Sequence, residues 1–364
     1  MQKNAYLILE NGQIFEGKPF GYPCETTGEL VFTTVMTGYL ETLTDPSYYG
    51  QIVIQTFPLI GNYGVIPEDF ESDRPYLKAY VVRQWCQEPS NFRSKGALDS
   101  FLYEHGIPGI YDIDTRALTK IVREYGVMNA KIAFALPDNI DETIAGLKKY
   151  RIVNAVASVC KSDMVYSGPS DAPFRVVLWD FGAKGNIERM LLKRGCQVIT
   201  VPFSAGADEI KALDPDGLLI SNGPGNPAEN TGAVDQLKKL GEYKIPTFGI
   251  CLGHQLLALS RGAKTEKLKY GHRGANQPVI ERATGRIYIT SQNHGYTVVS
   301  STIPDTAVES YTNVNDGTCE GVKYTDIPAF SVQFHPEACG GPLDTGFLFD
   351  DFISLMRSAS KRGG

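Results

Sequence analysis

The sequence predicts an α/β protein in two parts, a strand-rich α+β domain followed by a domain whose mostly parallel open sheet is covered by helices on both faces. Three observations predict this fold class. Apolar and polar residues alternate in the first half, apolar runs alternate with helical patterns in the second, and a segment rich in Ser, Asp, Gly and Pro separates the halves. With 364 residues, of which 42% are hydrophobic, the chain can bury a core in each part.

The N-terminal α+β domain is expected over residues 1–150. It opens with AYLILENGQIFEGKPFG, in which apolar and polar residues alternate around an Asn-Gly turn, the pattern of a β-hairpin. More β-branched and aromatic residues follow as far as Phe57. The stretch DTRALTKIVREYG has a helical period, and we expect this helix to begin at Asp114 or Thr115 and to end at Gly126.

A linker is expected over residues 151–173, where KSDMVYSGPSDAP collects turn-forming residues. Over residues 174–364 we expect the second domain. Its strand-like runs are FRVVLWDFG, CQVITVPF, GLLISNGPG and IPTFGI, and the segments between them have helical periods. This alternation is typical of a parallel sheet with helices on both faces. The hairpin-like runs GRIYITSQNHGYTVV and AFSVQFHPEA follow, and a helix, FLFDDFISLMRSAS, ends the domain.

Composition and charge exclude several classes of function. The formal net charge is −6 and no block of Lys and Arg is present, so we expect neither a nucleic-acid nor a membrane partner. The sequence has no signal-peptide pattern and no apolar run of 18 residues, so we expect a soluble, cytoplasmic protein. The seven cysteines are single and lack zinc-ligand spacing, which predicts reduced thiols and no metal site. They are Cys24, Cys86, Cys160, Cys196, Cys251, Cys319 and Cys339.

One cysteine stands where an open sheet displays reactive groups. Cys251 lies in GICLGHQ, directly after the expected strand IPTFGI and directly before a helical pattern. Gly249 and Gly253 permit a tight strand-to-helix turn that exposes the side chain between them. The helix N-terminus favours a thiolate, and its free N–H groups can bind an oxyanion. Cys251 is therefore a candidate nucleophile, and the alternative is a buried cysteine that packs as a small hydrophobic residue.

A nucleophilic cysteine needs a base, and one histidine is well placed to supply it. His335 follows the expected strand AFSVQF and precedes Pro336 and Glu337. The proline fixes a turn, so the Glu337 carboxylate can orient the imidazole and complete a Cys-His-Glu triad. The alternative is a structural histidine at the end of a strand. The chain has five histidines, which are His105, His254, His272, His294 and His335.

The loop SNGPGNP follows the expected strand GLLI, which comes immediately before the strand IPTFGI in the chain. Its glycines allow the backbone to approach a ligand, and its N–H groups can complete an oxyanion hole. Gly223, Gly225 and Ala228 also match the G-x-G-x-x-A pattern of dinucleotide sites, but Pro224 and Pro227 interrupt the loop and the expected helix start and acidic residue are missing. No G-x-x-x-x-G-K-[ST] motif is present, so we expect no ATP site in this chain.

With SNGPG, GICLGHQ and HPE in this order, the second half resembles the class I, or triad, glutamine amidotransferases. The stretch FGICLGHQLLALSRGAKTEKLKYGHRGANQPV is similar to one branch, the small glutaminase subunits of carbamoyl phosphate synthetase. In the first half, VMTGYLETLTDPSYYGQIVIQTFPLIGNYGV and YDIDTRALTKIVREYG resemble the N-terminal domain of the same subunits. The resemblance thus covers essentially the whole chain.

The resemblance implies a role for each matching residue. It assigns Cys251 as nucleophile, His335 as acid and base and Glu337 as the orienting carboxylate, with the amides of Gly223 and Leu252 as the oxyanion hole. The positions that hold L-glutamine in this family are Ser47, Gly225, Gln255, Asn293, Gly295 and Tyr296. Ser47 is expected to reach the site from the other domain. Without the resemblance, Ser47 reads as a turn residue after a proline.

The resemblance also implies a partner. A large subunit would bind ATP, magnesium and bicarbonate, receive ammonia from this chain and make carbamoyl phosphate, and this chain itself would need no cofactor. Two alternatives remain at this point: a glutaminase that serves another synthetase or acts alone, and a non-catalytic regulatory subunit. The MTGY and DPSY segments argue against the first, and the intact set of Cys251, His335 and Glu337 argues against the second.

Overall fold

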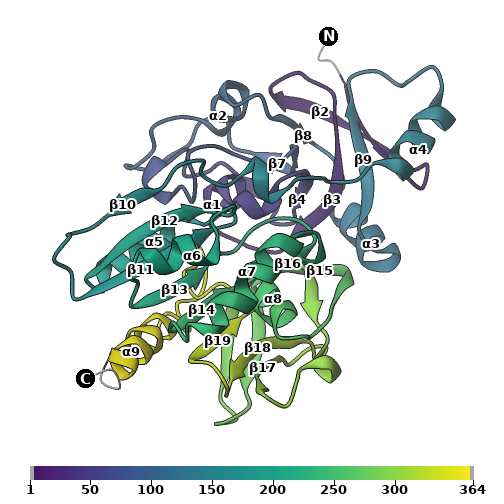
Figure 1. Ribbon diagram of the computed structural model, residues 1–364. Coiled ribbons are helices and arrows are strands. Elements are labelled where there is room, and N and C mark those ends of the chain that lie inside the picture. The colour runs from purple at the N-terminus through teal and green to yellow at the C-terminus, as the bar shows by residue number, and fades with distance from the viewer. Residues whose placement is uncertain (1–3, 361–364) are drawn as a thin grey trace. The chain divides into compact units, whose positions relative to one another are not determined.

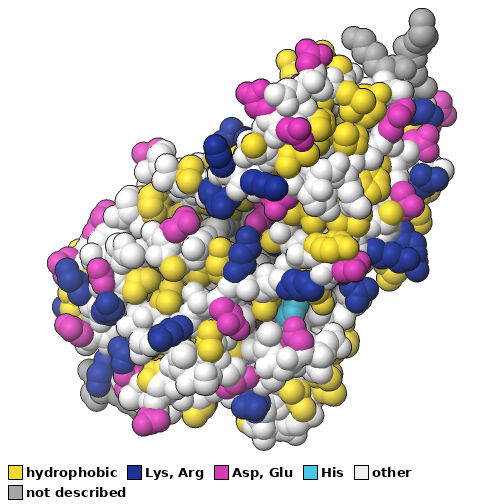
Figure 2. Space-filling view, turned by 90° about the vertical axis from the view of Figure 1, so that its right-hand side faces the viewer, with side chains coloured by type: hydrophobic (Ala, Val, Ile, Leu, Met, Phe, Trp, Pro, Cys, Tyr) yellow, Lys and Arg dark blue, Asp and Glu magenta, His cyan; other side chains and the backbone are white. Residues whose placement is uncertain are grey.

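The structure, a computed structural model, describes residues 4–360 and consists of two compact units, one up to Ala155 and one from Val156 onward (Figure 1). Among the described residues, no helix is both long enough and apolar enough to cross a lipid bilayer. On the face drawn in Figure 2, Lys and Arg side chains are interspersed with Asp and Glu, as a modest net charge leads one to expect.

The N-terminal unit is built on a closed β-barrel with the strand order β1-β2-β8-β6-β4-β3-β9. The strands of this unit are β1 (Ala5–Leu9), β2 (Ile14–Gly21), β3 (Thr26–Thr33), β4 (Gln51–Gln55), β5 (Leu59–Ile60), β6 (Ala79–Val81), β7 (Gln84–Trp85), β8 (Pro108–Tyr111) and β9 (Met128–Ala133). Its helices are α1 (Tyr39–Thr44), α2 (Leu98–Glu104), α3 (Thr115–Tyr125) and α4 (Ile140–Lys149), with 3₁₀ turns at Pro46–Tyr48 and Pro67–Asp69. Closure of the barrel leaves no free sheet edge among these seven strands.

Two local predictions in this unit are confirmed. Strands β1 and β2 pair antiparallel around the Asn-Gly turn, where Gly12 has a φ of 88°, a value that favours glycine. Helix α3 begins after Asp114, whose side chain accepts a hydrogen bond from the Ala117 N–H, and it ends at Gly126, which has a φ of 95°.

The C-terminal unit contains a ten-stranded sheet in the order β10-β12-β11-β13-β14-β19-β18-β17-β15-β16. The strands are β10 (Val165–Ser167), β11 (Phe174–Asp180), β12 (Cys196–Pro202), β13 (Gly217–Ile220), β14 (Thr247–Ile250), β15 (Thr265–Glu281), β16 (Ile287–Val298), β17 (Ala307–Asn313), β18 (Cys319–Tyr324) and β19 (Ala329–Val332). The helices are α5 (Gly185–Lys193), α6 (Ala207–Ala212), α7 (Thr231–Glu242), α8 (Leu252–Ser260) and α9 (Leu348–Ser360), with 3₁₀ turns at Val156–Ser158, Pro227–Glu229 and Ser300–Thr302. Strands β12, β11, β13, β14 and β19 are mutually parallel.

Helices cover both faces of the parallel strands, as the alternation of strands and helices predicts. Val177 and Trp179 of β11 belong to a core that includes residues of α6, α7 and α8. Val176 and Leu178, which point to the opposite face, belong to a second core with residues of α5 and α9. The sheet is therefore buried on both sides, which explains why its strands read as continuous apolar runs.

The fold brings four loops to one edge of this sheet. The parallel neighbours β11, β13, β14 and β19 all end there, at Asp180, Ile220, Ile250 and Val332. Because the carboxyl ends of parallel strands share one edge, the residues that follow these four positions converge.

Candidate active site

Cys251 occupies the sharp turn between β14 and α8. It is the N-cap of α8, it is 2% exposed, and its backbone has a φ of 54° and a ψ of −104°. A non-glycine residue rarely adopts a positive φ, and such strain is typical of a displayed nucleophile. The Cys251 N–H donates to the Val332 carbonyl (2.9 Å) and the Gly253 N–H to the Ser221 carbonyl (3.0 Å), so two neighbouring strand ends hold the turn.

The turn leaves no room for side chains at its glycines. A Cβ on Gly253 would lie 2.2 Å from the Ile220 carbonyl oxygen, and a Cβ on Gly249 would lie 2.8 Å from the Gly253 carbonyl oxygen. Both neighbours are backbone atoms, which cannot move aside as a flexible side chain can. The two glycines are therefore required by close packing between β13, β14 and α8.

His335 and Glu337 form a buried ion pair beside this turn. His335 Nδ1 lies 2.7 Å from Glu337 Oε1, and the two residues are 2% and 1% exposed. Burial lowers the pKa of His335, but the Glu337 carboxylate and the nearby Cys251 sulfur outweigh it and raise the pKa above its usual value. His335 Nε2, the ring nitrogen away from Glu337, is buried and has no hydrogen-bond partner among the described residues, and Cys251 is near enough to raise the pKa of the imidazole. The structure brings all three predicted triad residues together.

Lys184 is a charged member of the site that the sequence analysis did not select. Its Nζ lies 3.5 Å from Glu337 Oε1, and the Lys184 side chain is 10% exposed. Burial raises the pKa of Glu337, but His335 and Lys184 lower it by more, so the carboxylate is ionised. The side chain of Asn186 also donates to the Glu337 carbonyl oxygen. Glu337 is therefore held from the loop that follows β11 and from the first turn of α5.

That loop is fixed by side-chain hydrogen bonds to its backbone. Asp180 Oδ1 accepts from the N–H groups of Gly182 and Ala183, both at 2.8 Å. Asn222 Oδ1 accepts from the Lys184 N–H (3.1 Å), and Asn222 Nδ2 donates to the Gly182 carbonyl (3.1 Å). The loops after β11 and β13 are thereby joined, which places Lys184 at the same sheet edge as Cys251.

The two residues predicted to supply the oxyanion hole lie close together, since a Cβ on Gly223 would be 2.9 Å from Leu252 Cδ2. Leu252 is the first residue of α8, and Gly223 lies in the loop after β13. Across residues 4–360, the N–H of neither residue donates to a backbone carbonyl outside the regular elements. A Cβ on Gly223 would lie 2.2 Å from the Phe181 carbonyl oxygen, so glycine is needed for the loop to pass this close to its neighbour. Gly225, two residues on, has a φ of 91° and is exposed.

Four further predicted glutamine-binding residues lie in this unit. The Cys251 Sγ lies 3.8 Å from the Asn293 carbonyl oxygen, which places β16 next to the nucleophile. Gly295 and Tyr296 follow on the same strand and are half-buried. Gln255 is buried, and its Nε2 donates to the Tyr296 carbonyl and to Gln333 Oε1, both at 2.8 Å. The Gln255 amide thus connects α8 to β16 and to the residue after β19.

Ser47 belongs to the N-terminal unit. It lies in the 3₁₀ turn Pro46–Tyr48, is 8% exposed, and its N–H donates to Asp45 Oδ1 (2.9 Å). The residue is therefore held in a fixed turn, as its position after a proline indicates.

A signal for the overlooked residues is present in the sequence. Lys184 and Asn186 follow closely after the predicted strand-like run FRVVLWDFG, and parallel strands share a reactive edge. Polar residues at the end of every predicted parallel strand are thus site candidates, and this rule selects both residues.

Comparison with known proteins shows the family to which both units belong. The family described as "Carbamoyl-phosphate synthase small chain, CPSase domain" matches residues 7–132, and "Glutamine amidotransferase class-I" matches residues 177–355. Proteins named carbamoyl phosphate synthase small chain are 48% identical in Bacillus caldolyticus, over 98% of both chains, and 49% identical in Fusobacterium nucleatum, over 98% of this chain and 99% of the relative. One from Streptococcus pyogenes is 49% identical over 97% of both chains. The chain therefore belongs to the carbamoyl phosphate synthase small chain family.

Proposed function

We propose that this chain is the glutamine-hydrolysing subunit of carbamoyl phosphate synthase and that it releases ammonia from L-glutamine through a thioester on Cys251. The observation that carries the proposal is the strained, buried Cys251 at a helix N-terminus beside the His335–Glu337 ion pair. A core cysteine needs neither a positive φ nor a charged imidazole next to it. Cys251, His335 and Glu337 together supply the nucleophile, the acid and base and the orienting carboxylate that covalent acyl transfer requires.

The first step is formation of the thioester. The Cys251 thiolate attacks the side-chain carbonyl carbon of glutamine, and the resulting oxyanion accepts hydrogen bonds from the N–H groups of Gly223 and Leu252. The His335 imidazolium then donates its proton to the amide nitrogen as the C–N bond breaks. Ammonia leaves, and the glutamyl group stays on sulfur.

The second step is hydrolysis. His335, now neutral, accepts a proton from a water molecule whose oxygen attacks the thioester carbon at the same oxyanion hole. The C–S bond breaks, glutamate is released, and the thiolate and imidazolium are restored. Glu337 keeps the imidazole oriented through both steps and stabilises its charged form, because it accepts from Nδ1 at 2.7 Å.

Six residues are proposed to hold glutamine in position for this attack. They are Ser47, Gly225, Gln255, Asn293, Gly295 and Tyr296. The support comes from the motif positions and, for the last three, from their place on β16 next to the Cys251 sulfur. Gln255 is proposed to act chiefly through the Tyr296 carbonyl, to which its side chain donates.

The proposal includes a partner, a large subunit that binds ATP, magnesium and bicarbonate and turns the ammonia into carbamoyl phosphate. The relatives in the comparison are named small chains, which supports the existence of a large one. Ammonia stays reactive only while it is unprotonated, so direct delivery to that subunit is part of the proposal. All seven cysteines are free thiols, which supports a reducing compartment such as the cytoplasm.

Replacement of the nucleophile tests the proposal. In Cys251→Ala, no thioester can form, so we expect glutamine hydrolysis to fall by about 10⁴-fold or more. Carbamoyl phosphate synthesis from added ammonium chloride, measured with the large subunit present, should remain at the level of the unchanged complex.

A matched control is Cys196→Ala, because Cys196 is also buried but lies at the start of β12, away from the reactive edge. It should retain glutamine hydrolysis. Glutamate release at the normal rate by Cys251→Ala would refute the mechanism. If Cys251→Ala lost the ammonia-dependent reaction together with glutamine hydrolysis, the substitution would be shown to disturb the large subunit and not only thioester formation.

A further inference from the structure

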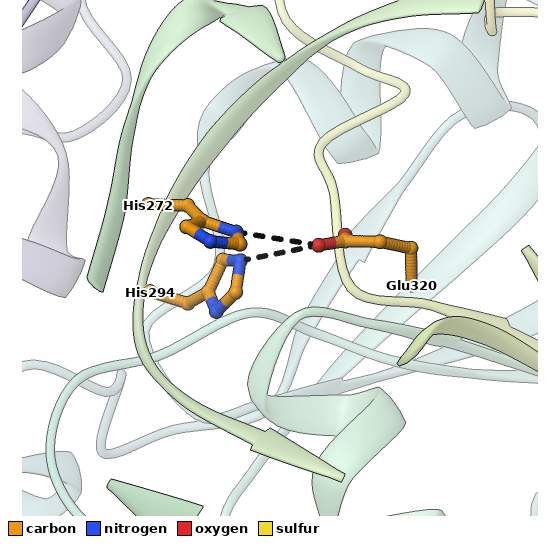
Figure 3. A group of neighbouring side chains, drawn as sticks. All are labelled: His272, His294 and Glu320. Atoms are coloured by element: carbon orange, nitrogen blue, oxygen red, sulfur yellow. Dashed lines mark ion pairs between the residues drawn. The ribbon is translucent and has the colours of Figure 1, made fainter. Parts of the chain in front are cut away.

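A second cluster of ionisable side chains lies outside the proposed triad. His272 on β15, His294 on β16 and Glu320 on β18 are all buried, and one ligand atom from each lies within 4.8 Å of the others. Figure 3 shows both imidazole rings directed at the Glu320 carboxylate. His272 Nδ1 is 3.4 Å and His294 Nε2 is 3.9 Å from Glu320 Oε1. Three strands thus direct two imidazoles and a carboxylate at one point.

The outer nitrogen of each ring is held by a hydrogen-bond acceptor. His272 Nε2 lies 2.7 Å from Asp316 Oδ2, and His294 Nδ1 lies 2.8 Å from the Tyr296 carbonyl oxygen. A carboxylate and a carbonyl can only accept, so each outer nitrogen carries a proton. In a neutral imidazole, the inner nitrogen then carries a lone pair. The inner nitrogens, His272 Nδ1 and His294 Nε2, both face the Glu320 carboxylate.

A fourth electron-pair donor joins them. Gln292 Nε2 donates to Glu320 Oε2 (3.0 Å) and to Thr290 Oγ1 (3.1 Å), which fixes the orientation of its amide. Gln292 Oε1 consequently faces His272 Nδ1 at 2.9 Å and His294 Nε2 at 3.1 Å. The donors that approach from outside are Asn313 Nδ2, at 3.4 Å from His272 Nδ1, and Thr318 Oγ1, at 3.4 Å from Glu320 Oε1.

Protons alone do not give both inner ring nitrogens a suitable partner. A proton on each inner nitrogen would create two buried imidazolium ions with ring centroids 4.9 Å apart, which like-charge repulsion opposes. Burial lowers the pKa of His272, but hydrogen bonds to Asp316 and Glu320 raise it by more, to about 9, whereas burial holds the pKa of His294 well below its usual value. Without a metal ion, the proton is therefore on His272, and the lone pair of His294 Nε2 faces the Gln292 oxygen at 3.1 Å. A single divalent cation between the four atoms satisfies all of them while both rings stay neutral.

We propose that His272 Nδ1, His294 Nε2, Glu320 Oε1 and Gln292 Oε1 bind one divalent transition-metal ion of the zinc class. Ligand atoms around a tetrahedral zinc with bonds of about 2.0–2.1 Å are about 3.3 Å apart. The two inner nitrogens lie 3.4 Å and 3.9 Å from Glu320 Oε1 and 2.9 Å and 3.1 Å from Gln292 Oε1, so the four separations bracket this value. The contacts of the outer nitrogens with Asp316 and Tyr296 are those that orient metal-bound histidines in proteins. With four protein ligands in a buried position, the site is structural and has no open coordination position.

The metal would join three strands behind the proposed glutamine-binding segment. His272 and His294 are register partners on β15 and β16, and Glu320 lies on β18. His294 lies between Asn293 and Gly295, and its outer nitrogen contacts the Tyr296 carbonyl that also accepts from Gln255. Cysteine spacing gave no sign of this site, because none of its ligands is a cysteine. The metal proposal does not depend on the proposed hydrolysis of glutamine.

Metal binding to the full-length chain tests the proposal. Cys251→Ala is used as the parent protein. In the unchanged protein, the Cys251 thiol and His335 could together bind zinc and give a false signal. After dialysis against a chelator, the protein is titrated with Zn²⁺ in a calorimeter and its retained zinc is measured by mass spectrometry. We expect about one tightly bound Zn²⁺ per chain, a higher melting temperature with Zn²⁺, and at least about 100-fold weaker binding in Glu320→Gln and His272→Gln.

The matched control is His105→Gln, because His105 lies in the N-terminal unit and contacts the Phe101 carbonyl. It should bind Zn²⁺ as the parent does. Binding no tighter than about 10 μM in the parent, or equal binding in Glu320→Gln, would overturn the proposal. If the ligand variants do not fold, the visible absorption of the parent protein is measured after Co²⁺ is added. A four-coordinate N₂O₂ site gives strong absorption. Its absence would overturn the assignment.

Discussion

Glu337 lies between two cationic side chains. Its Oε1 is 2.7 Å from His335 Nδ1 and 3.5 Å from Lys184 Nζ, and both cations lower its pKa against the effect of burial. In return, the Glu337 carboxylate raises the pKa of His335, whereas burial and the Lys184 ammonium lower it. The balance favours a protonated imidazole, which is the form needed to donate a proton to leaving ammonia.

Glu337→Gln keeps the shape of the side chain and removes its charge. Because the carboxylate raises the pKa of His335, we expect that pKa to fall in the variant. The basic limb of the kcat/KM profile, where the imidazolium loses its proton, should therefore move to lower pH. Thioester turnover should slow by about 10²-fold or more, because the imidazole loses its charged orienting partner. Glutamine hydrolysis across the pH range, with rapid-quench measurement of the thioester, checks both effects.

Glu242→Gln provides the control for this substitution, because Glu242 is an exposed residue at the end of α7. Its pH profile should match that of the unchanged protein. A Glu337→Gln profile with the basic limb in its original place would remove Glu337 from the proposed triad.

The turn from β14 to α8 sets the position of the nucleophile. A Cβ at residue 253 would meet the Ile220 carbonyl oxygen at 2.2 Å, so Gly253→Ala must displace α8 from the end of β13. The Leu252 N–H would move with the helix and would no longer point at the proposed oxyanion. We expect the free energy of unfolding to fall by about 2–4 kcal/mol and kcat to fall by about 10²-fold or more.

Gly232 offers a matched glycine on α7. A Cβ there has no neighbour within 4 Å, so Gly232→Ala should stabilise the helix by up to about 1 kcal/mol and leave hydrolysis unchanged. Denaturant unfolding and steady-state kinetics on both variants make the comparison. Equal stability of Gly253→Ala and the unchanged protein would show that α8 tolerates the shift and that its close approach to β13 is not required.

Local patterns predicted the elements that depend on local sequence. The Asn-Gly hairpin, the helix capped by Asp114 and the alternation around β11–β14 all follow from residue periodicity and turn chemistry. Closure of the N-terminal barrel did not follow, because it needs β3 to pair with β4 and β9, and pairings between distant segments leave no periodic signal. Strand β15 was also missed, since its sequence lacks alternation and its pairing with β16 is interrupted by register shifts.

The candidate site was predictable to the extent that each residue lies in a recognisable motif. Cys251 and His335 each follow an apolar strand, which is a local signal. Its position after a predicted parallel strand makes Lys184 a candidate, but its contact with Glu337 depends on the closure of the loop after β11 onto Asn222 of the next loop, which leaves no local signal. The His272, His294 and Glu320 cluster was missed for the same reason, because its members come from three strands that only the sheet brings together.

Both units of the chain are needed if Ser47 helps to bind glutamine. Ser47 lies in the N-terminal unit and is held by Asp45 in a fixed turn. Removal of its hydroxyl in Ser47→Ala leaves that backbone hydrogen bond in place, so we expect a small change in stability. Loss of one substrate hydrogen bond should raise the KM for glutamine by about 10-fold, with a smaller change in kcat. Ser100→Ala, at an exposed position on α2, should change neither parameter. An unchanged KM in Ser47→Ala would remove Ser47 from the proposed glutamine site.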